Sequence, residues 1–257
     1  MKNSLMSTTR KARHGTQARP VFRSPAAPAV PAGPAASEVV WVYAVTADLD
    51  ADQISGLTGV AGEPVRVVTE AGLGAVVGSV DDTVFGEYSL TSLLTDLTTV
   101  EMVGRAHHKV IASTASAGPV VPLRLATTYP DDATIRMLLA ARRAELTEML
   151  QDFTGRQEWG VKVYVEPCAD AGTAAEGWAR KIDQALSDIA VASRQDYSPD
   201  PLPGDQVGWM ALNGVYLLGA ERAAEFAEIV QALTAEHDAL KADVTGPWPP
   251  YSFADRP

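Results

Sequence analysis

Cysteine is nearly absent from this 257-residue sequence, and it has no long apolar run. The single cysteine, Cys168, cannot form a disulfide within the chain and has no second cysteine at the C-x-x-C spacing of zinc and redox sites. No stretch reaches the roughly 18 consecutive apolar residues of a membrane-spanning helix, and no short apolar segment follows the N-terminal charges as in a secretory signal. These absences predict a soluble cytoplasmic protein.

Positive charge is scarce outside the first residues. The formal net charge is −11, yet residues 1–37 carry six basic side chains and no acidic one. The remaining chain therefore holds 15 basic against 32 acidic side chains. An acidic body repels phosphate backbones, so nucleic acid is excluded as a partner of the folded part. A lipid membrane is also excluded from the predicted partners, because no segment is suited to span one.

The common catalytic motifs are absent as well. The glycines match neither G-x-G-x-x-G nor G-x-x-x-x-G-K-[ST], and no G-x-S-x-G or H-E-x-x-H occurs. The only adjacent histidines, His107 and His108, would point about 100° apart on a helix and cannot bind one metal ion from the same face. We therefore predict no catalytic, cofactor-binding or metal-binding residue.

Residues 1–37 combine scattered basic residues with five prolines among alanines. Such a composition buries too little apolar surface to offset its ordering entropy, so we expect a disordered basic tail. Its acid-free start superficially resembles a transit peptide, but it lacks a clear amphipathic face, and a solvated extension explains it as well.

Residues 38–130 show the pattern of a modified ferredoxin-like α+β domain, in the order strand, hairpin, helix, strand. The hairpin is expected at the turn-like Glu70-Ala71-Gly72, and the helix from apolar residues that recur every three or four positions. Its expected elements are a strand from Val39, strands Val65–Thr69 and Leu73–Val80, a helix from Leu93 to about Gly118, and a strand Val120–Thr127.

Residues 131–257 are expected to form a second, C-terminal α+β domain. Pro130-Asp131-Asp132 favours a helix start, because proline suits the first turn and carboxylates suit the positive end of the helix dipole. The expected elements are a helix from Pro130 to Gly155, a strand Trp159–Glu166, a helix around Trp178–Ile189, a loop Ser198–Gln206, a strand Trp209–Leu218, a helix Glu221–His237 and a strand Leu240–Thr245.

Four residues are candidates for partner binding. Arg105 lies four residues after Glu101 on the predicted helix, and Arg124 is expected opposite an apolar strand face. Trp248 and Tyr251 belong to the proline-rich segment 246–253, which favours an extended ribbon. These aromatic side chains could anchor a partner or clamp the segment onto the protein's own core, and we favour the clamp.

Five segments in order resemble the GvpF/GvpL family of gas vesicle proteins, over about Val39 to Phe253. They are Trp41–Val45, Gly104–His108, Val121–Thr127, Glu158–Val163 and Thr245–Phe253. The resemblance implies an N-terminal domain of modified ferredoxin-like fold and a C-terminal α+β domain. It also implies a minor gas vesicle component that associates with the small hydrophobic shell protein and is needed for assembly, and it offers no catalytic residues.

Our first hypothesis is accordingly a non-enzymatic accessory component of gas vesicles that binds the shell protein, and further accessory proteins, in the cytoplasm. Unassembled shell subunits must expose apolar surface, and an acidic protein with sheet edges could keep them soluble. The second hypothesis is a small-molecule-binding enzyme or sensor whose interdomain pocket uses His108, Arg105 or Arg124. The third is a homo-oligomeric structural domain paired through sheet edges, and the sequence leaves the oligomeric state open.

Overall fold

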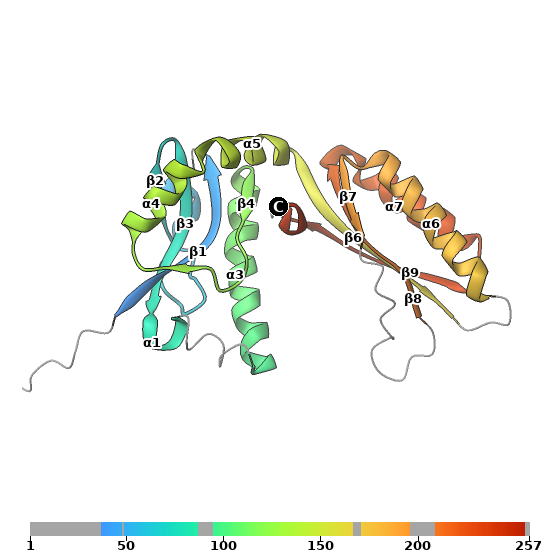
Figure 1. Cartoon of the computed structure of the whole chain (residues 1–257), viewed down its shortest axis with the longest axis horizontal. Coiled ribbons are helices and arrows are strands. Elements are labelled where there is room, and N and C mark those ends of the chain that lie inside the picture. Colours follow the sequence, from blue (N-terminus) through green and yellow to red (C-terminus); the bar gives the residue numbers. More distant parts are fainter. Residues whose placement is uncertain (1–36, 48, 87–94, 167–170, 196–208, 255–257) are drawn as a thin grey trace, which may run out of the picture. The chain divides into compact units, whose positions relative to one another are not determined.

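A computed structural model describes residues 37–47, 49–86, 95–166, 171–195 and 209–254 (Figure 1). The described residues form helices and two antiparallel sheets, which confirms the predicted α+β class. The predicted tail apart from Ser37, the predicted loop Ser198–Gln206 and Cys168 lie outside these residues.

The first sheet contains the strands predicted from Val39 and from the hairpin. Its strand order is β2-β3-β1-β4, all pairs are antiparallel, and β5 also pairs with β1. The short 3-10 helix η1 (Ala51–Ile54) lies between the first two strands in sequence, and α1 (Asp82–Phe85) follows the third. In a ferredoxin-like domain an α-helix follows the first strand directly, and among the described residues no α-helix follows β1 before β2. The ferredoxin-like topology of this domain therefore stays a prediction. The strands are β1 (Glu38–Ala47), β2 (Arg66–Glu70), β3 (Leu73–Asp81), β4 (Val120–Pro122) and β5 (Thr128–Tyr129).

The hairpin turns at Ala71 and Gly72, as predicted. Both residues have positive φ, 54° and 79°, as in the two-residue turns whose twist matches that of the paired strands. Glycine adopts this conformation without steric cost, whereas at Ala71 the Cβ atom crowds the backbone and makes the same conformation unfavourable.

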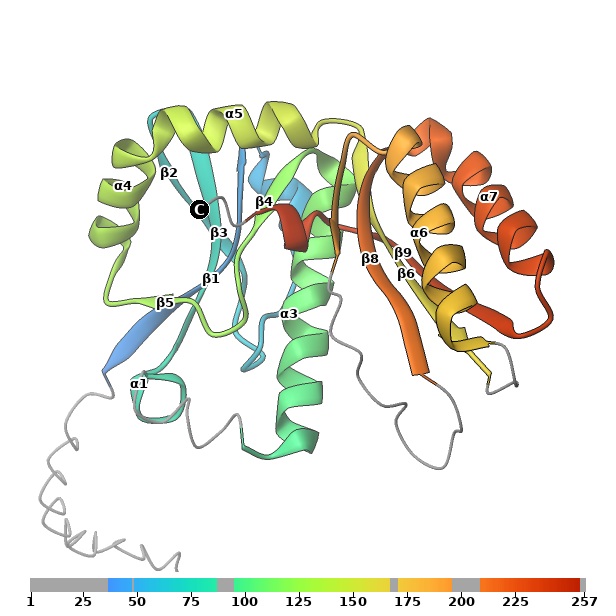
Figure 2. The same cartoon turned by 45° about the vertical axis from the view of Figure 1, so that its right-hand side comes forward.

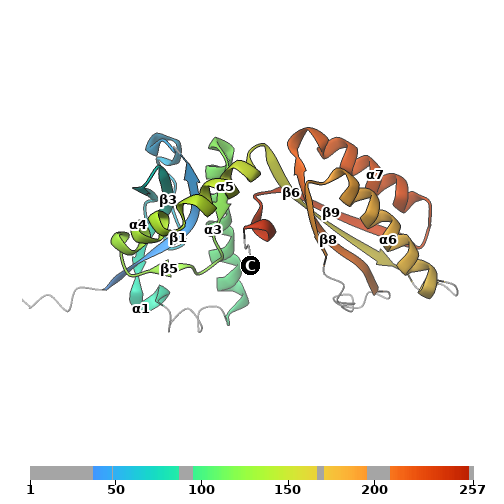
Figure 3. The same ribbon diagram turned by 45° about the horizontal axis from the view of Figure 1, so that its top comes forward.

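Helices cover both faces of the first sheet. Successive residues of β1 point to opposite faces, so Trp41 and Tyr43 pack with α3 (Leu97–Ala117), while Val40 and Val42 pack with α4 (Asp132–Ala141) and α5 (Arg143–Phe153). Figures 2 and 3 show α3 and the α4–α5 pair around this sheet. The helix that we predicted from Leu93 to about Gly118 is α3. It ends there, but the predicted start is wrong, because α3 begins at Leu97 after its N-cap Asp96.

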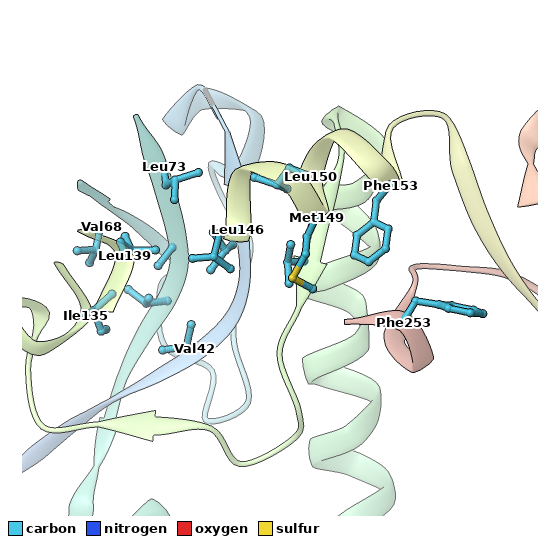
Figure 4. Close-up of a cluster of buried hydrophobic side chains, with 14 of the residues drawn as sticks. Val42, Val68, Leu73, Ile135, Leu139, Leu146, Met149, Leu150, Phe153 and Phe253 are labelled. Atoms are coloured by element: carbon cyan, nitrogen blue, oxygen red, sulfur yellow. The ribbon is translucent and has the colours of Figure 1, made fainter. Parts of the chain in front are cut away.

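The single helix predicted from Pro130 to Gly155 is wrong. The chain forms two helices that meet at Arg142, whose φ and ψ of −100° and 14° leave the helical range. The apolar side chains of both helices nevertheless share one core with the first sheet (Figure 4). The domain boundary near Pro130 stays a prediction, and the structure places the two helices that follow it against the first sheet.

The strand predicted over Val120–Thr127 is only partly correct. β4 ends at Pro122, and the chain then turns before β5. Ala126 has a left-handed φ of 69°, and the Arg124 carbonyl accepts from both the backbone N–H and the hydroxyl of Thr127, at 3.3 and 2.8 Å. The backbone of Leu123 and of Thr127 still bonds β1, but the turn between these residues interrupts the predicted alternation.

The second sheet has the order β7-β8-β6-β9, again antiparallel. One core joins it to α6 (Ala171–Ile189) and α7 (Ala223–Ala235). The sequence predicted these elements except β7, and β9 continues three residues beyond Thr245. Because β9 lies at the end of the strand order, its single proline, Pro247, displaces no partner strand. The strands are β6 (Arg156–Val165), β7 (Ala192–Gln195), β8 (Trp209–Gly219) and β9 (Leu240–Trp248); the short helices η2 (Ala220–Arg222) and η3 (Tyr251–Phe253) complete the fold.

Candidate partner-binding groove

A groove of about 750 Å³ opens over the first sheet, beside α4 and α5. Its floor is formed by side chains of β1, β3 and β4 that point away from α3, and its wall by α4 and α5. We call it the sheet groove. It is lined by Val42, Val45, Ala75, Val121, Pro122, Leu123, Arg124, Thr127, Tyr129, Ile135, Leu138, Leu139, Arg142, Leu146, Arg194 and Ala254.

The apolar character of the groove follows from the sheet pattern. The floor residues Val42 and Val45 are buried and belong to the core shared with α4 and α5. Leu138 is only half-buried, and so it presents apolar surface to the groove beside the buried Leu139. A concave site of this volume with apolar walls and a few polar groups is typical of binding sites.

Three arginines line the groove, whereas none of its lining residues is acidic. Arg142, at the α4–α5 junction, binds the Glu145 carboxylate through Nε and Nη2, at 2.9 and 2.6 Å. Arg194 of β7 lies over the ring of Phe253, with its Cζ 5.5 Å from the ring centre. Arg124 stands exposed on the turn after β4. The predicted candidate Arg124 therefore lies at the groove, but on a turn and not on a strand.

A buried histidine holds the turn that carries Arg124. Trp41 Nε1 donates to His107 Nδ1 at 3.0 Å, so the ring proton resides on Nε2, which donates to the Leu123 carbonyl at 3.1 Å. Burial lowers the pKa of His107, chiefly because desolvation penalises the charged ring. The neutral ring thus links α3 to the residue before Arg124. The spacing of residues in the sequence did not indicate this bond.

The C-terminal segment makes the contacts of an internal clamp. Glu158 is 6% exposed, and its carboxylate accepts from the backbone N–H and the hydroxyl of Ser252, at 2.7 and 2.9 Å. Tyr251 Oη lies 2.8 Å from Nδ1 of His108 on α3, and Phe253 is buried in the core of the first sheet. Burial raises the pKa of Tyr251, with the charge of Glu158 adding to the effect, so its hydroxyl stays neutral.

Trp248 and Arg105 remain accessible. Trp248 is 39% exposed and meets the His108 ring edge-on, with centroids 5.2 Å apart. The Arg105 side chain is 79% exposed and pairs with Glu101, as its spacing predicted. The partner roles of Arg105, Arg124, Trp248 and Tyr251 stay predictions.

The structure brings one candidate residue of the second hypothesis to the sheet groove. Of His108, Arg105 and Arg124, only Arg124 lines the sheet groove. In the part of the chain that the structure describes, no three His, Cys, Asp or Glu side chains gather as a metal site would require. The described helices also include none long and apolar enough to cross a membrane.

These features define the class of protein: two antiparallel sheets with helical layers and an apolar, arginine-lined groove suited to binding. The chain belongs to the family described as gas vesicle synthesis protein GvpL/GvpF, whose model matches residues 39–176 and 169–255. The resemblance found in the sequence is therefore confirmed. Membership places the chain among gas vesicle proteins and associates it with these structures.

Relatives match over most of their length. Gas vesicle protein L of Streptomyces sp. (strain CB03234) is 32% identical over 246 residues, which cover 83% of this chain and 92% of the relative. Gas vesicle protein F1 of Halobacterium salinarum is 28% identical over 225 residues, covering 85% and 94%.

Solved structures share the fold at low identity. The crystal structure of GvpF from Anabaena sp. PCC7120 aligns with a TM-score of 0.64 and 18% identity, covering 86% of this chain and 98% of that one. GvpF from Microcystis aeruginosa aligns with a TM-score of 0.60 and 17% identity, covering 85% and 99%. The two-sheet architecture is thus common to these proteins and the present chain.

Proposed function

We propose that this protein is a non-enzymatic accessory component of gas vesicles, which binds the small hydrophobic shell protein and aids vesicle assembly. The observation that carries the proposal is the sheet groove, a concave apolar surface on a protein of the gas vesicle family. A shell subunit has to expose apolar surface before it is built into the wall, and exposed apolar surface aggregates. Binding in the groove covers part of that surface, and the acidic body keeps the complex soluble.

Co-expression of the tagged full-length protein with the shell protein of the same cell tests the proposal. Leu138→Asp places a charge in the groove wall and should abolish most capture in a pull-down. Met137→Asp is its matched control, because Met137 is the neighbouring residue of α4, is 65% exposed and does not line the groove. Capture that is equal for both variants would place shell binding outside the groove. The proposal fails if the folded wild-type protein captures no shell protein and is missing from the buoyant fraction of a flotation assay.

We propose Trp248 as an additional contact, since it is the exposed aromatic side chain of the C-terminal segment. Trp248→Ala should weaken capture in a variant that melting curves show to be folded. Tyr251→Ala instead removes the bond to His108, so its effect on capture is to be compared with its effect on stability. A Trp248→Ala variant that captures as well as the wild type would assign this tryptophan to the clamp.

A further inference from the structure

The charge of the sheet groove is opposite to that of the chain around it. The protein has a net charge of −11, yet the groove is lined by three arginines and no acidic residue. An apolar floor alone would bind any hydrophobic segment of the right size. Guanidinium groups at the margin of such a floor favour occupants that combine apolar side chains with carboxylates.

The three arginines differ in their surroundings. Arg142 is held by two bonds to Glu145, and the charge of Arg194 helps to lower the pKa of Glu158, against the larger effect of burial. Arg124 is exposed on the turn that follows β4, and its backbone carbonyl accepts hydrogen bonds from Thr127. A change of the Arg124 side chain therefore alters the charge of the groove and keeps these turn bonds.

We infer that the groove binds an amphipathic segment of the shell protein that carries at least one carboxylate beside its apolar side chains, and that Arg124 determines this specificity. The inference rests on the proposed function and names the chemistry of the occupant. The groove volume of about 750 Å³ is of the size that holds a few anchoring side chains, so the occupant is a short segment and not a whole domain. Arginine suits this role, because its planar fork can bind both oxygens of a carboxylate.

The first experiment measures binding of overlapping synthetic peptides, which tile the shell protein, to the purified full-length protein by fluorescence anisotropy. The peptide that binds should contain Asp or Glu next to apolar residues. Arg124→Glu should weaken its binding about tenfold or more, and Arg124→Lys about threefold, because lysine keeps the charge but not the fork. Arg222→Glu is the matched control. It makes the same charge change on an arginine that lies outside the groove and pairs with Glu225, and it should change the Kd less than about twofold.

The reciprocal change is made in the peptide. Replacing its acidic residues by Asn or Gln should weaken binding to the wild-type protein and remove the difference between wild type and Arg124→Glu. Equal binding of the acidic and amide peptides to both proteins would overturn the inference and leave the proposed function intact.

A second arm covers the case in which isolated peptides fail to bind. Arg124→Glu and Arg222→Glu are compared in the co-expression pull-down, with melting curves as the check on folding. Loss of capture confined to Arg124→Glu supports the inference, and equal capture by both variants and the wild type overturns it. If the wild type itself captures nothing, the proposed function has failed, which is a distinguishable result.

Discussion

The bond between Glu158 and Ser252 gives a quantitative test of the C-terminal clamp. The Glu158 carboxylate is buried and accepts two hydrogen bonds from Ser252, from the backbone N–H at 2.7 Å and from the hydroxyl at 2.9 Å. A hydrogen bond to a charged group contributes about 1.5–3 kcal/mol, compared with about 0.5–1.5 kcal/mol between neutral groups. Ser252→Ala removes the hydroxyl bond and should lower the free energy of unfolding at pH 7 by about 1.5–3 kcal/mol.

The effect of pH has a definite sign. Burial raises the pKa of Glu158 above its ordinary value of 4.5, although the Ser252 bonds and the charge of Arg194 lower it in part. The folded state therefore holds more protons than the unfolded state between about pH 4.5 and the folded-state pKa, and stability falls as pH rises through that window. Ser252→Ala raises this pKa further. The deficit of the variant should accordingly be smallest near pH 4.5 and should grow as pH rises through that window.

The assay is chemical denaturation, combined with hydrogen exchange of the amides of residues 251–254. A double-mutant cycle with Glu158→Gln isolates the interaction, since glutamine keeps the shape and removes the charge. In the Glu158→Gln background, Ser252→Ala should cost only about 0.5–1.5 kcal/mol and show no such pH dependence. Ser193→Ala, which removes an exposed bond to Ser187, should cost less than about 0.5 kcal/mol. A deficit for Ser252→Ala that is independent of pH, or a coupling energy near zero, would refute the reasoning.

Three further predictions concern the first sheet. Because the folded-state pKa of His107 is lowered, its contribution to stability should fall as pH drops below about 6.5, with a sign opposite to that of Glu158. In thermal melts, the wild type should therefore lose more stability between pH 7 and pH 5 than His107→Phe does. Leu146→Ala should lower the free energy of unfolding in a urea titration by about 2–5 kcal/mol, since Leu146 of α5 is buried in the core of the first sheet. A loss below about 1 kcal/mol would contradict that packing. Ala71→Asn should raise the free energy of unfolding by about 0.5–1 kcal/mol, because asparagine tolerates positive φ better; the backbone carbonyl that bonds Arg143 is retained. No gain in the same urea titration would mean that the turn is not strained.

The elements that the sequence predicted well are those with a strong local signal. The stripe of α3 repeats over 21 residues, and Asp96 caps its start by accepting from the Thr99 N–H at 3.0 Å. The hairpin has a turn glycine between two apolar strands. In such segments the periodicity and the turn chemistry indicate the same structure as tertiary packing, so the sequence alone was sufficient.

Other elements depend on contacts between distant residues. The α4–α5 break falls at Arg142, which is a good helix former, and the apolar spacing across it suits one continuous helix. No local signal marks this break, since it arises where the two helices pack on the sheet. β7 was missed for the same reason: its four residues, Ala192–Gln195, have no apolar alternation and form a strand only because β8 pairs with them.

The candidate site shows how a residue predicted from an incorrect element can still lie at the groove. Alternation placed Arg124 opposite Val121 and Leu123 on one long strand, which indicated an accessible cation next to apolar surface. In the structure, the strand ends at Pro122, and the bond from His107 to the Leu123 carbonyl holds the turn that follows. If β4 continued to Thr127, Arg124 would lie on a regular strand face; the turn places it at the margin of the groove instead. His107 therefore acts as a positioning residue for the charge at the groove. The two hydrogen bonds of His107 connect α3, β1 and the turn, which are far apart in the sequence. The spacing of residues along the chain could therefore not reveal this role.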